Sequence, residues 1–387
     1  MADWDVIVVG AGIVGSWTAF HLISQNKKVL LIDQFPLPHT RGSSNGPTRL
    51  IRSFYDKEEY MNLVGDSYDW WKKLGELGKT TIFENTGVMV LEAEPYNFLK
   101  VCSNTMKKCN VKHWWLDQEQ MSKGYPMFSY DKGYRALYDP NAGLLYSNKS
   151  MQLVQEQFKL RGGVIRDSFK VSSVKEIGEI VQVSSKHESF TAKKVVMCPG
   201  PWAKELLRAT GLNVPLTTMP GRQAYFKVKD ENMYDIRNGI PILMEEIIEK
   251  DGYRFIIVKP ENEFPGLIKV ATRGQPLIKE AHPDERDKVA EPEVYDVLTN
   301  YVKDHLPYVD PAPCITENCV YTMTPDRGYI VDQHPTMSNV FVGAGFSGHG
   351  FKTAPMTGKL LSEMALEQPL SHDVSKFRIT RFNQSKL

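Results

Sequence analysis

The residues best suited to chemistry begin with a glycine-rich turn near the N-terminus. Gly10, Gly12 and Gly15 form a complete GxGxxG motif. An apolar run at residues 5–9 precedes the motif, and helical spacing follows at residues 16–24. The first glycine permits a tight turn, the second leaves room for a pyrophosphate, and the third lets a helix pack closely on a strand. The turn therefore predicts a dinucleotide site at a helix N-terminus, whose free N–H groups favour phosphate.

A second apolar run, at residues 29–32, ends at Asp33. A carboxylate at the end of the second strand of a βαβ unit can accept hydrogen bonds from ribose hydroxyls. Strand, turn, helix and acid are thus in the order that a dinucleotide-binding fold requires. This pattern by itself leaves the choice between NAD and FAD open.

A second glycine-rich block, GAGFSGHGFK, lies at residues 343–352. The apolar residues at 339–342 precede it, so the block is expected to join a strand to a helix. Gly345, Gly348 and Gly350 would let backbone N–H groups approach a ligand closely. Reduced flavin carries negative charge along one edge of its ring, and a helix N-terminus would stabilise that charge.

Length and charge narrow the class of protein. The chain has 387 residues, more than one hydrophobic core usually supports, which predicts two domains. With 47 Lys and Arg against 46 Asp and Glu, the net charge of +1 points to neither nucleic acid nor an anionic membrane as a partner. No apolar stretch is long enough to span a membrane. The 5 cysteines are irregularly spaced, which predicts free thiols and no metal site.

The last three residues are Ser385, Lys386 and Leu387. A C-terminal SKL tripeptide is the address read by the peroxisomal import receptor. We therefore expect a peroxisomal protein.

The remaining elements predict two interleaved domains. Continuous apolar runs in the first residues suit a parallel sheet covered on both faces. By contrast, the segments at 222–229, 253–259 and 267–271 alternate with a period of two, which suits an antiparallel sheet. The expected fold class is α/β plus α+β, with a Rossmann-type domain and an interleaved antiparallel-sheet domain. The expected boundaries are 1–85, 145–220 and 320–387 for the nucleotide-binding domain, and 86–144 and 221–319 for the substrate domain.

Beyond GxGxxG, the chain resembles the family of FAD amine oxidases that contains monomeric sarcosine oxidase, N-methyltryptophan oxidase and L-pipecolate oxidase. The most specific segment is the GAGFSGHGFK block. The resemblance implies FAD as cofactor, a D-amino acid oxidase-like fold, a monomer, and oxidation of a secondary or cyclic amino acid by O2 to an imine and hydrogen peroxide. The other segments that carry it are residues 35–39, 42–44, 48–52, 319–322, 325–326, 332–335 and 377–382.

The resemblance also assigns roles to individual residues. Cys319 matches the cysteine that bonds covalently to the flavin 8α-methyl carbon. Arg52 and Lys352 match the cations that hold the substrate carboxylate, and Arg49 matches a residue near the flavin ring. Lys269 matches a lysine that activates O2. The other cofactor-contacting positions that it implies are Ser43, Ser44, Val171, Phe346, His349 and Phe351, together with the glycines of the two blocks and Asp33.

These roles have a physical basis. A carboxylate in a water-poor site needs cations, and the planar fork of Arg52 suits it. Lys269 interrupts an apolar strand, which is costly unless the ammonium is paired or useful. A fixed cation would stabilise superoxide as it forms. The alternative for Lys269 is an edge strand from which the side chain points into solvent.

The chain departs from the bacterial sarcosine oxidases in several segments, and residues 255–258, FIIV, stand where those enzymes contribute a substrate-facing tyrosine. Ser44 and Asn45 stand where that pattern has a histidine pair, and Thr272 and Arg273 stand where it has Tyr-His. The substrate therefore stays open among sarcosine, L-pipecolate and related N-alkyl amino acids. Two other functions also stay open: a flavin dehydrogenase that passes electrons to another acceptor, and a flavin-binding protein without turnover.

Overall fold

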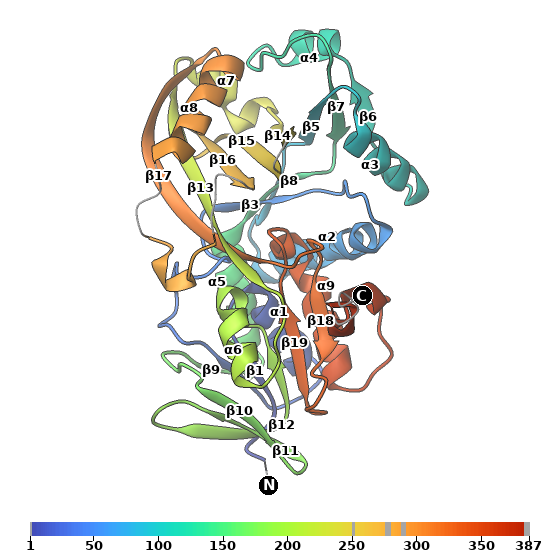
Figure 1. Ribbon diagram of the computed structural model, residues 1–387, viewed down its shortest axis with the longest axis vertical. Coiled ribbons are helices and arrows are strands. Elements are labelled where there is room, and N and C mark those ends of the chain that lie inside the picture. The colour runs from blue at the N-terminus through green and yellow to red at the C-terminus, as the bar shows by residue number, and fades with distance from the viewer. Residues whose placement is uncertain (1, 250–251, 275–279, 288–291, 383–387) are drawn as a thin grey trace.

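The computed structural model describes residues 2–249, 252–274, 280–287 and 292–382. Two large sheets follow one another along the long axis of the molecule (Figure 1). A small sheet of three strands lies between them. Its strands are β3 (Thr48–Ile51), β8 (Gly143–Tyr146) and β4 (Phe83–Asn85).

The first sheet has a parallel core in the order β9, β2, β1, β12, β19. This is the strand order of a dinucleotide-binding sheet, and it confirms the βαβ unit expected from the N-terminal sequence. The apolar runs of β1 and β2 are buried on both faces because helices cover the sheet. The core strands are β1 (Trp4–Val9), β2 (Val29–Ile32), β9 (Val164–Arg166), β12 (Ser189–Met197) and β19 (Val340–Ala344); β10 (Ser173–Ile177), β11 (Ile180–Ser184) and β18 (Ile330–Gln333) extend it in antiparallel fashion.

Helix α1 (Ile13–Ile23) is buried along its whole length. It packs between α5 (Ser147–Leu160) and α9 (Gly350–Ala365), and α9 in turn packs on α2 (Glu58–Gly78). Because α1 and α9 begin at the two glycine-rich blocks, their contact brings both blocks to one edge of the first sheet. Further helices are α3 (Asn97–Lys108), α4 (Gln118–Gly124), α6 (Ala203–Ala209), α7 (Glu231–Tyr234) and the 3-10 turns Gly200–Trp202, Ile236–Asn238, Pro283–Glu285, Ser375–Phe377 and Ile379–Phe382.

The second sheet runs in the order β17, β13, β16, β15, β14, β5, β7, β6. Its pairings are antiparallel as expected, except that β14 pairs with β5 in parallel. These two strands are far apart in the chain, so no hairpin forces them to run in opposite directions. The strands are β5 (Val88–Ala93), β6 (Trp114–Leu116), β7 (Tyr134–Asp139), β13 (Thr217–Val228), β14 (Ile242–Glu249), β15 (Gly252–Phe264), β16 (Leu267–Gly274) and β17 (Val309–Met323).

The two faces of the second sheet have different partners. Ile256 and Ile268 pack with Leu298 of α8 (Pro292–His305) in one hydrophobic core. With a period of two, the neighbouring residues Ile257 and Ala271 face the opposite way, toward the first sheet. Figure 1 shows the long strands β13 and β17 reaching down toward the first sheet. The domain boundaries expected from the sequence stay a prediction.

No helix in the described ranges is long and apolar enough to cross a membrane. Nor do the described His, Cys, Asp and Glu side chains form a group suited to holding a metal ion.

The Gly10 and Gly15 positions of the GxGxxG turn leave no room for a side chain. Gly10 has φ +102°, and a Cβ on it would lie 2.2 Å from the carbonyl oxygen of Cys198. At Gly15 a Cβ would lie 1.9 Å from the carbonyl oxygen of Gly10. Gly15 therefore allows α1 to begin directly against β1, as the motif predicts.

We expect Gly15→Ala to displace the turn, because the main-chain oxygen of Gly10 cannot yield as a flexible side chain would. The free energy of unfolding should fall by about 1–3 kcal/mol, the usual cost of overpacking, and flavin content should fall with it. The matched control is Gly65→Ala, since Gly65 lies inside α2 with no atom within 4 Å of the added carbon. That change should stabilise the helix by up to about 1 kcal/mol. Denaturant unfolding measures the stability of each variant, and flavin absorbance measures its flavin content. Equal stability of the two variants would contradict the prediction.

Candidate active site

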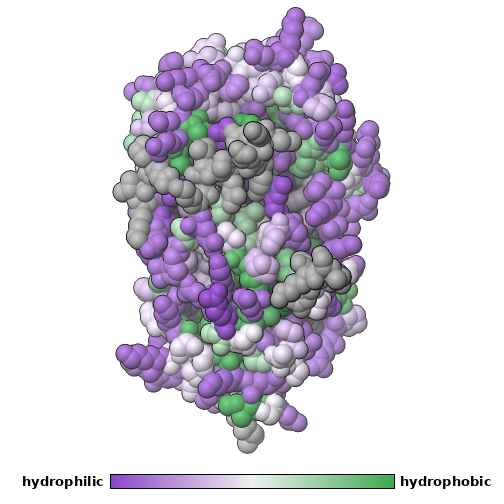
Figure 2. Space-filling view, in the orientation of Figure 1, coloured by the Kyte–Doolittle hydropathy of each residue, from purple (hydrophilic) through white to green (hydrophobic). Residues whose placement is uncertain are grey.

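A cavity of about 500 Å³ lies where the two large sheets meet. Its lining includes both glycine-rich blocks and the inward face of the second sheet. Figure 2 shows hydrophobic side chains toward the middle of this side of the molecule. Of the site residues expected from the sequence, all line the cavity except Lys269.

The nucleotide end of the cavity is formed by the GxGxxG turn and Asp33. The Asp33 carboxylate accepts hydrogen bonds from the backbone N–H of Ala11 at 2.8 Å and of Phe35 at 2.9 Å. His39 Nε2 lies 3.2 Å from the same carboxylate. A carboxylate has about four lone-pair sites, so Asp33 orders the loop and keeps capacity for a ligand hydroxyl. Val171 also borders this part of the cavity.

The loop that carries Ser43 and Ser44 closes over the start of α1. Ser44 Oγ accepts a hydrogen bond from the N–H of Ile13 at 2.9 Å. Ser43 Oγ donates to the carbonyl oxygen of Val320. The two serines therefore tie the first glycine block to strand β17, which carries Cys319. They stabilise the wall of the cavity through these hydrogen bonds, a role that the sequence did not predict.

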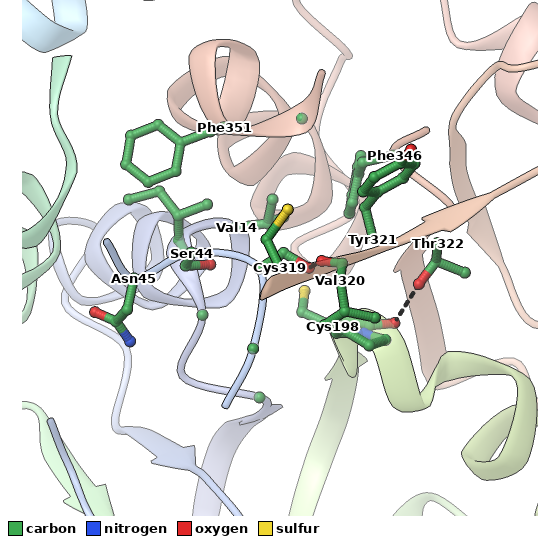
Figure 3. Close-up of a pocket in the computed structure, with 18 of the residues that line it drawn as sticks. Val14, Ser44, Asn45, Cys198, Cys319, Val320, Tyr321, Thr322, Phe346 and Phe351 are labelled. Carbon is green, nitrogen blue, oxygen red and sulfur yellow. Dashed lines mark hydrogen bonds between the residues drawn. The ribbon is translucent and has the colours of Figure 1, made fainter. Parts of the chain in front are cut away.

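Cys319 lies on β17 with its sulfur directed toward the open space between Phe346 and Phe351 (Figure 3). Its partner across the strands is Gly221 of β13. A Cβ on Gly221 would lie only 2.4 Å from the Cys319 sulfur, so this glycine makes room for the thiol. All 5 cysteines of the chain are free thiols, as expected.

The second glycine-rich block forms the opposite wall. Gly345 and Gly348 have positive φ, at +61° and +77°, a conformation that favours glycine. The ring of Phe351 stacks on Trp71, with centroids 5.6 Å apart and planes 3° apart. This contact fixes the first turn of α9 beside the cavity.

His349 uses both ring nitrogens within the protein. Its Nε2 lies 3.2 Å from the carbonyl oxygen of Arg327, which can only accept, so Nε2 carries the proton. Nδ1 then accepts a hydrogen bond from Tyr329 Oη at 2.7 Å. Burial, with Lys352 nearby, holds the pKa of His349 well below its usual range. The neutral ring holds the loop in place and has no nitrogen left for a ligand.

Arg52 and Lys352 are both brought to the cavity and both buried, each 6% exposed. The guanidinium of Arg52 lies 4.1 Å from the ring centroid of Phe54, and its buried Nε has no hydrogen-bond partner. Burial first, then repulsion from Arg52 and Arg273, holds the pKa of Lys352 well below its usual range. These two residues and Arg273 thus form a group of three neighbouring cations, and we call it the cation triad.

Arg273 joins this group through the second glycine block. Its Nη1 donates to the carbonyl oxygen of Gly348 at 3.1 Å, and its buried Nε has no partner. A Cβ on Gly348 would lie 2.2 Å from that Nη1. Arg49, also at the cavity, donates to the carbonyl oxygens of Ser43 at 2.9 Å and Asn45 at 2.6 Å. Both arginines are therefore held by main-chain oxygens.

Lys269 is buried at 3% exposure, but it does not line the main cavity. It lines a small adjoining pocket and contacts the carboxylate of Glu263. Its strand β16 lies between β13 and β15, so the alternative of an edge strand with the lysine in solvent does not hold. Its neighbour Lys259 of β15, in contrast, does line the main cavity.

Sequence reasoning missed Lys259, although the period-two pattern at 253–259 ended on it. Its importance depends on register: Lys259 and Lys269 are partners across β15 and β16, and both point to the same side of the sheet. That pairing includes an irregularity after Lys259, which spacing alone does not reveal. Gly221 was missed as well, because a lone glycine in a strand pattern carries no indication of what faces it.

The residues around the cavity fit an FAD. The turn at Gly10 and Gly12 leaves the main chain bare at a helix N-terminus, where a pyrophosphate binds. Arg49, Arg52 and Arg273 line a cavity whose carboxylates are few, so an anionic ligand would be favoured. The second glycine block adds a further helix N-terminus, at α9.

Comparison with known proteins agrees with this chemistry. The family model described as FAD dependent oxidoreductase matches residues 5–364. The chain is 36% identical to peroxisomal sarcosine oxidase of Homo sapiens, over 98% of this chain and 96% of that protein. It is 31% identical to monomeric sarcosine oxidase of Arthrobacter sp., with the same coverage.

Solved structures share the fold. The amino acid oxidase NikD, in its open form, superposes with a TM-score of 0.83 at 20% identity, and 97% of each chain is covered. Glycine oxidase from Geobacillus kaustophilus has a TM-score of 0.80 at 16% identity, over 98% of this chain and 99% of that one. The chain with this cavity, two glycine-rich blocks and buried cations belongs to the FAD-dependent oxidoreductases and, among them, to the sarcosine oxidase family of amine oxidases.

Proposed function

We propose that the protein oxidises a secondary or cyclic amino acid, such as sarcosine, L-pipecolate or a related N-alkyl amino acid, with O2 as acceptor. The products would be an imine and hydrogen peroxide. The observation that carries the proposal is the cation triad of Arg52, Arg273 and Lys352 at a cavity that suits FAD. The relatives named sarcosine oxidase and N-methyl-L-tryptophan oxidase support the substrate class.

The triad would bind the substrate carboxylate. In a buried site, charge-assisted hydrogen bonds are strong and directional, and a planar carboxylate matches the fork of Arg52. A bound carboxylate would raise the pKa of Lys352 again, since it opposes the repulsion from Arg52 and Arg273. Lys352 Nζ would then hold a proton while substrate is bound. FAD supplies the acceptor for the hydride equivalent that leaves the carbon next to nitrogen.

The polar cluster around Lys269 supports O2 as acceptor over another electron carrier. Lys259, Lys269 and Glu263 lie together beside the cavity, and they hold two cations against one deeply buried anion. A fixed cation beside the cavity would stabilise superoxide as it forms. This arrangement favours an oxidase over the dehydrogenase alternative.

Three finer assignments belong to the same proposal. The FAD would be attached through Cys319, whose sulfur faces the cavity beside the second glycine block. The protein would act as a monomer in the peroxisome; relatives of Homo sapiens and Mus musculus are named peroxisomal, and bacterial ones are named monomeric. The SKL tripeptide at 385–387, which the import receptor would read, lies outside the described residues. The two domains would keep the boundaries given above.

Covalent attachment is tested by acid denaturation. Flavin fluorescence should stay with the unmutated polypeptide, whereas Cys319→Ser should release all FAD into the supernatant because no other nucleophile replaces the thiol. Cys314→Ser is the matched control, since Cys314 is exposed and does not line the cavity. Free FAD from the fully assembled parent protein would refute the bond but not flavin binding.

The oxygen reaction is tested with Lys269→Met. Burial raises the pKa of Glu263, but in the parent protein the two lysines outweigh burial and hold it at about 2. After this change Glu263 keeps Lys259 as its neighbouring cation and loses its contact with Lys269. Loss of one cation from this cluster should slow reoxidation of the reduced flavin by about 100-fold, equivalent to ~3 kcal/mol. Stopped-flow mixing of the reduced protein with air measures this rate. Reduction by substrate should change far less, and an unaltered reoxidation rate would remove Lys269 from the proposal.

The carboxylate site is tested with Arg52→Ala and Lys352→Ala. Removing one partner of a desolvated charge pair should lower kcat/KM by about thirty-fold to several thousand-fold. Flavin content should survive, since neither residue forms the Gly10 to Gly15 turn.

The decisive control is a substrate analogue whose carboxylate is replaced by a neutral amide. The parent enzyme should lose most of its activity on the amide, whereas the variants should barely distinguish the two compounds. If both variants discriminate as strongly as the parent, the carboxylate is held elsewhere, and Arg273 is the next residue to replace.

A further inference from the structure

Two lysines of the second sheet point to the same side, but they reach different spaces. Lys259 on β15 and Lys269 on β16 are partners in the antiparallel pairing. Lys259 lines both the main cavity and the small pocket beside it, whereas Lys269 lines only the small pocket. Of this pair, therefore, only Lys259 can meet a ligand in the main cavity.

The anion between them is shared unequally. Glu263 Oε2 contacts Lys269 Nζ directly and accepts a hydrogen bond from Tyr225 Oη. Glu263 Oε1 accepts from Thr48 Oγ1 and lies 4.0 Å from Lys259 Nζ, beyond hydrogen-bond reach. Lys259 Nζ instead donates to Thr48, to the carbonyl oxygen at 3.2 Å and to Oγ1 at 2.9 Å. The charge of Lys269 is thus neutralised at contact, and the charge of Lys259 is not.

The surrounding groups strengthen this difference. Glu317 of β17 lies 3.7 Å from Lys269 and adds a second carboxylate on that side. The charged and titratable neighbours that act on Lys259 are Lys269, Glu263, Arg49 and Cys319. Burial first, then repulsion from Lys269, lowers the pKa of Lys259 to about 7. Such an ammonium gains most from an anion that forms in the cavity.

We propose that Lys259 is the cation that faces the cofactor during the oxygen reaction, and that Lys269 is a positioning residue that acts through Glu263. The inference rests on the proposed oxidase function. Two electrons pass from the reduced cofactor to O2, which takes up two protons and leaves as hydrogen peroxide. Lys259 keeps its own proton and stabilises the superoxide charge after the first electron. Lys269 occupies Glu263 and so prevents this carboxylate from cancelling Lys259.

Charge balance gives a test that separates the two lysines. Lys259→Met should slow reoxidation by about 100-fold because it removes the cation that faces the cavity. Lys269→Met should slow it as well, because Glu263 then loses its contact cation and opposes the charge of Lys259. Adding Glu263→Gln should rescue only one of them. In Lys269→Met with Glu263→Gln, Lys259 stays charged and the rate should return to within about tenfold of the parent. In Lys259→Met with Glu263→Gln, the remaining charge sits on Lys269, away from the main cavity, and the rate should stay slow.

The flavin is reduced photochemically, so the measurement does not depend on the substrate. A parent protein whose reduced flavin does not react with air would overturn the oxidase proposal and this inference with it. A parent that reacts, with Lys259→Met reacting equally fast, would overturn the inference alone. Rescue of Lys259→Met in place of Lys269→Met would also overturn it, because the cavity-facing cation would then be Lys269.

Two further readouts move only if Lys259 faces the cofactor. The midpoint potential of the bound flavin, measured against a redox dye, should fall in both Lys259→Met and Lys269→Met, and adding Glu263→Gln should restore it only in Lys269→Met. A lower potential alone would speed electron transfer to O2, so a slower reaction cannot come from driving force.

The reoxidation rate of the parent should also fall as pH rises past the pKa of Lys259, which an anionic cofactor shifts above 7. Lys259→Arg should remove that fall and keep the fast rate; a pH profile unchanged by Lys259→Arg contradicts the assignment.

Discussion

Positive charge that is buried or half-buried beside the cavity, and not in contact with a carboxylate, is the constraint on which this structure depends. Taking a cation out of water is costly unless something polar replaces the water. Here the replacement is the main chain: carbonyl oxygens of Ser43 and Asn45 hold Arg49, and those of Phe54, Gly348 and His349 hold Arg52, Arg273 and Lys352. In the described ranges, none of these four cations forms an ion pair with a carboxylate. Their charge therefore remains available to an anionic cofactor or substrate.

This constraint explains why the loops around the cavity are ordered as they are. A carbonyl that holds a buried cation cannot turn away without exposing that cation to an apolar wall. The loop at 43–48 is fixed by the hydrogen bond from Arg49 to its main chain. It is also fixed by the contacts of its two serines with α1 and β17. Gly348 is fixed by Arg273 and by its own positive φ. The second glycine-rich block thus has two functions, since it exposes main-chain N–H groups to a ligand and supplies carbonyl oxygens to Arg273 and Lys352.

Two sheets of different construction are needed to build such a site. The parallel sheet places two helix N-termini at one edge, where phosphate and an anionic ring edge are favoured. The second sheet contributes a face on which alternate residues point into the cavity. Strands β13 and β17 join the two, because Gly221 and Cys319 lie opposite each other where these strands approach the first sheet.

The sequence by itself determined the elements whose physics is local. The GxGxxG turn, the strand that ends at Asp33 and the second glycine block were all predictable, because turn geometry and helix N-termini depend on adjacent residues. Resemblance at the level of motifs also indicated which arginines and lysines to examine. Only the tertiary structure decided which cation reaches the cavity. Lys259 and Lys269 follow the same alternation, and strand register together with the unequal contacts of Glu263 separates them. Register and ion pairing join residues that are distant or irregularly spaced in the chain, so they depend on the packing of the whole fold.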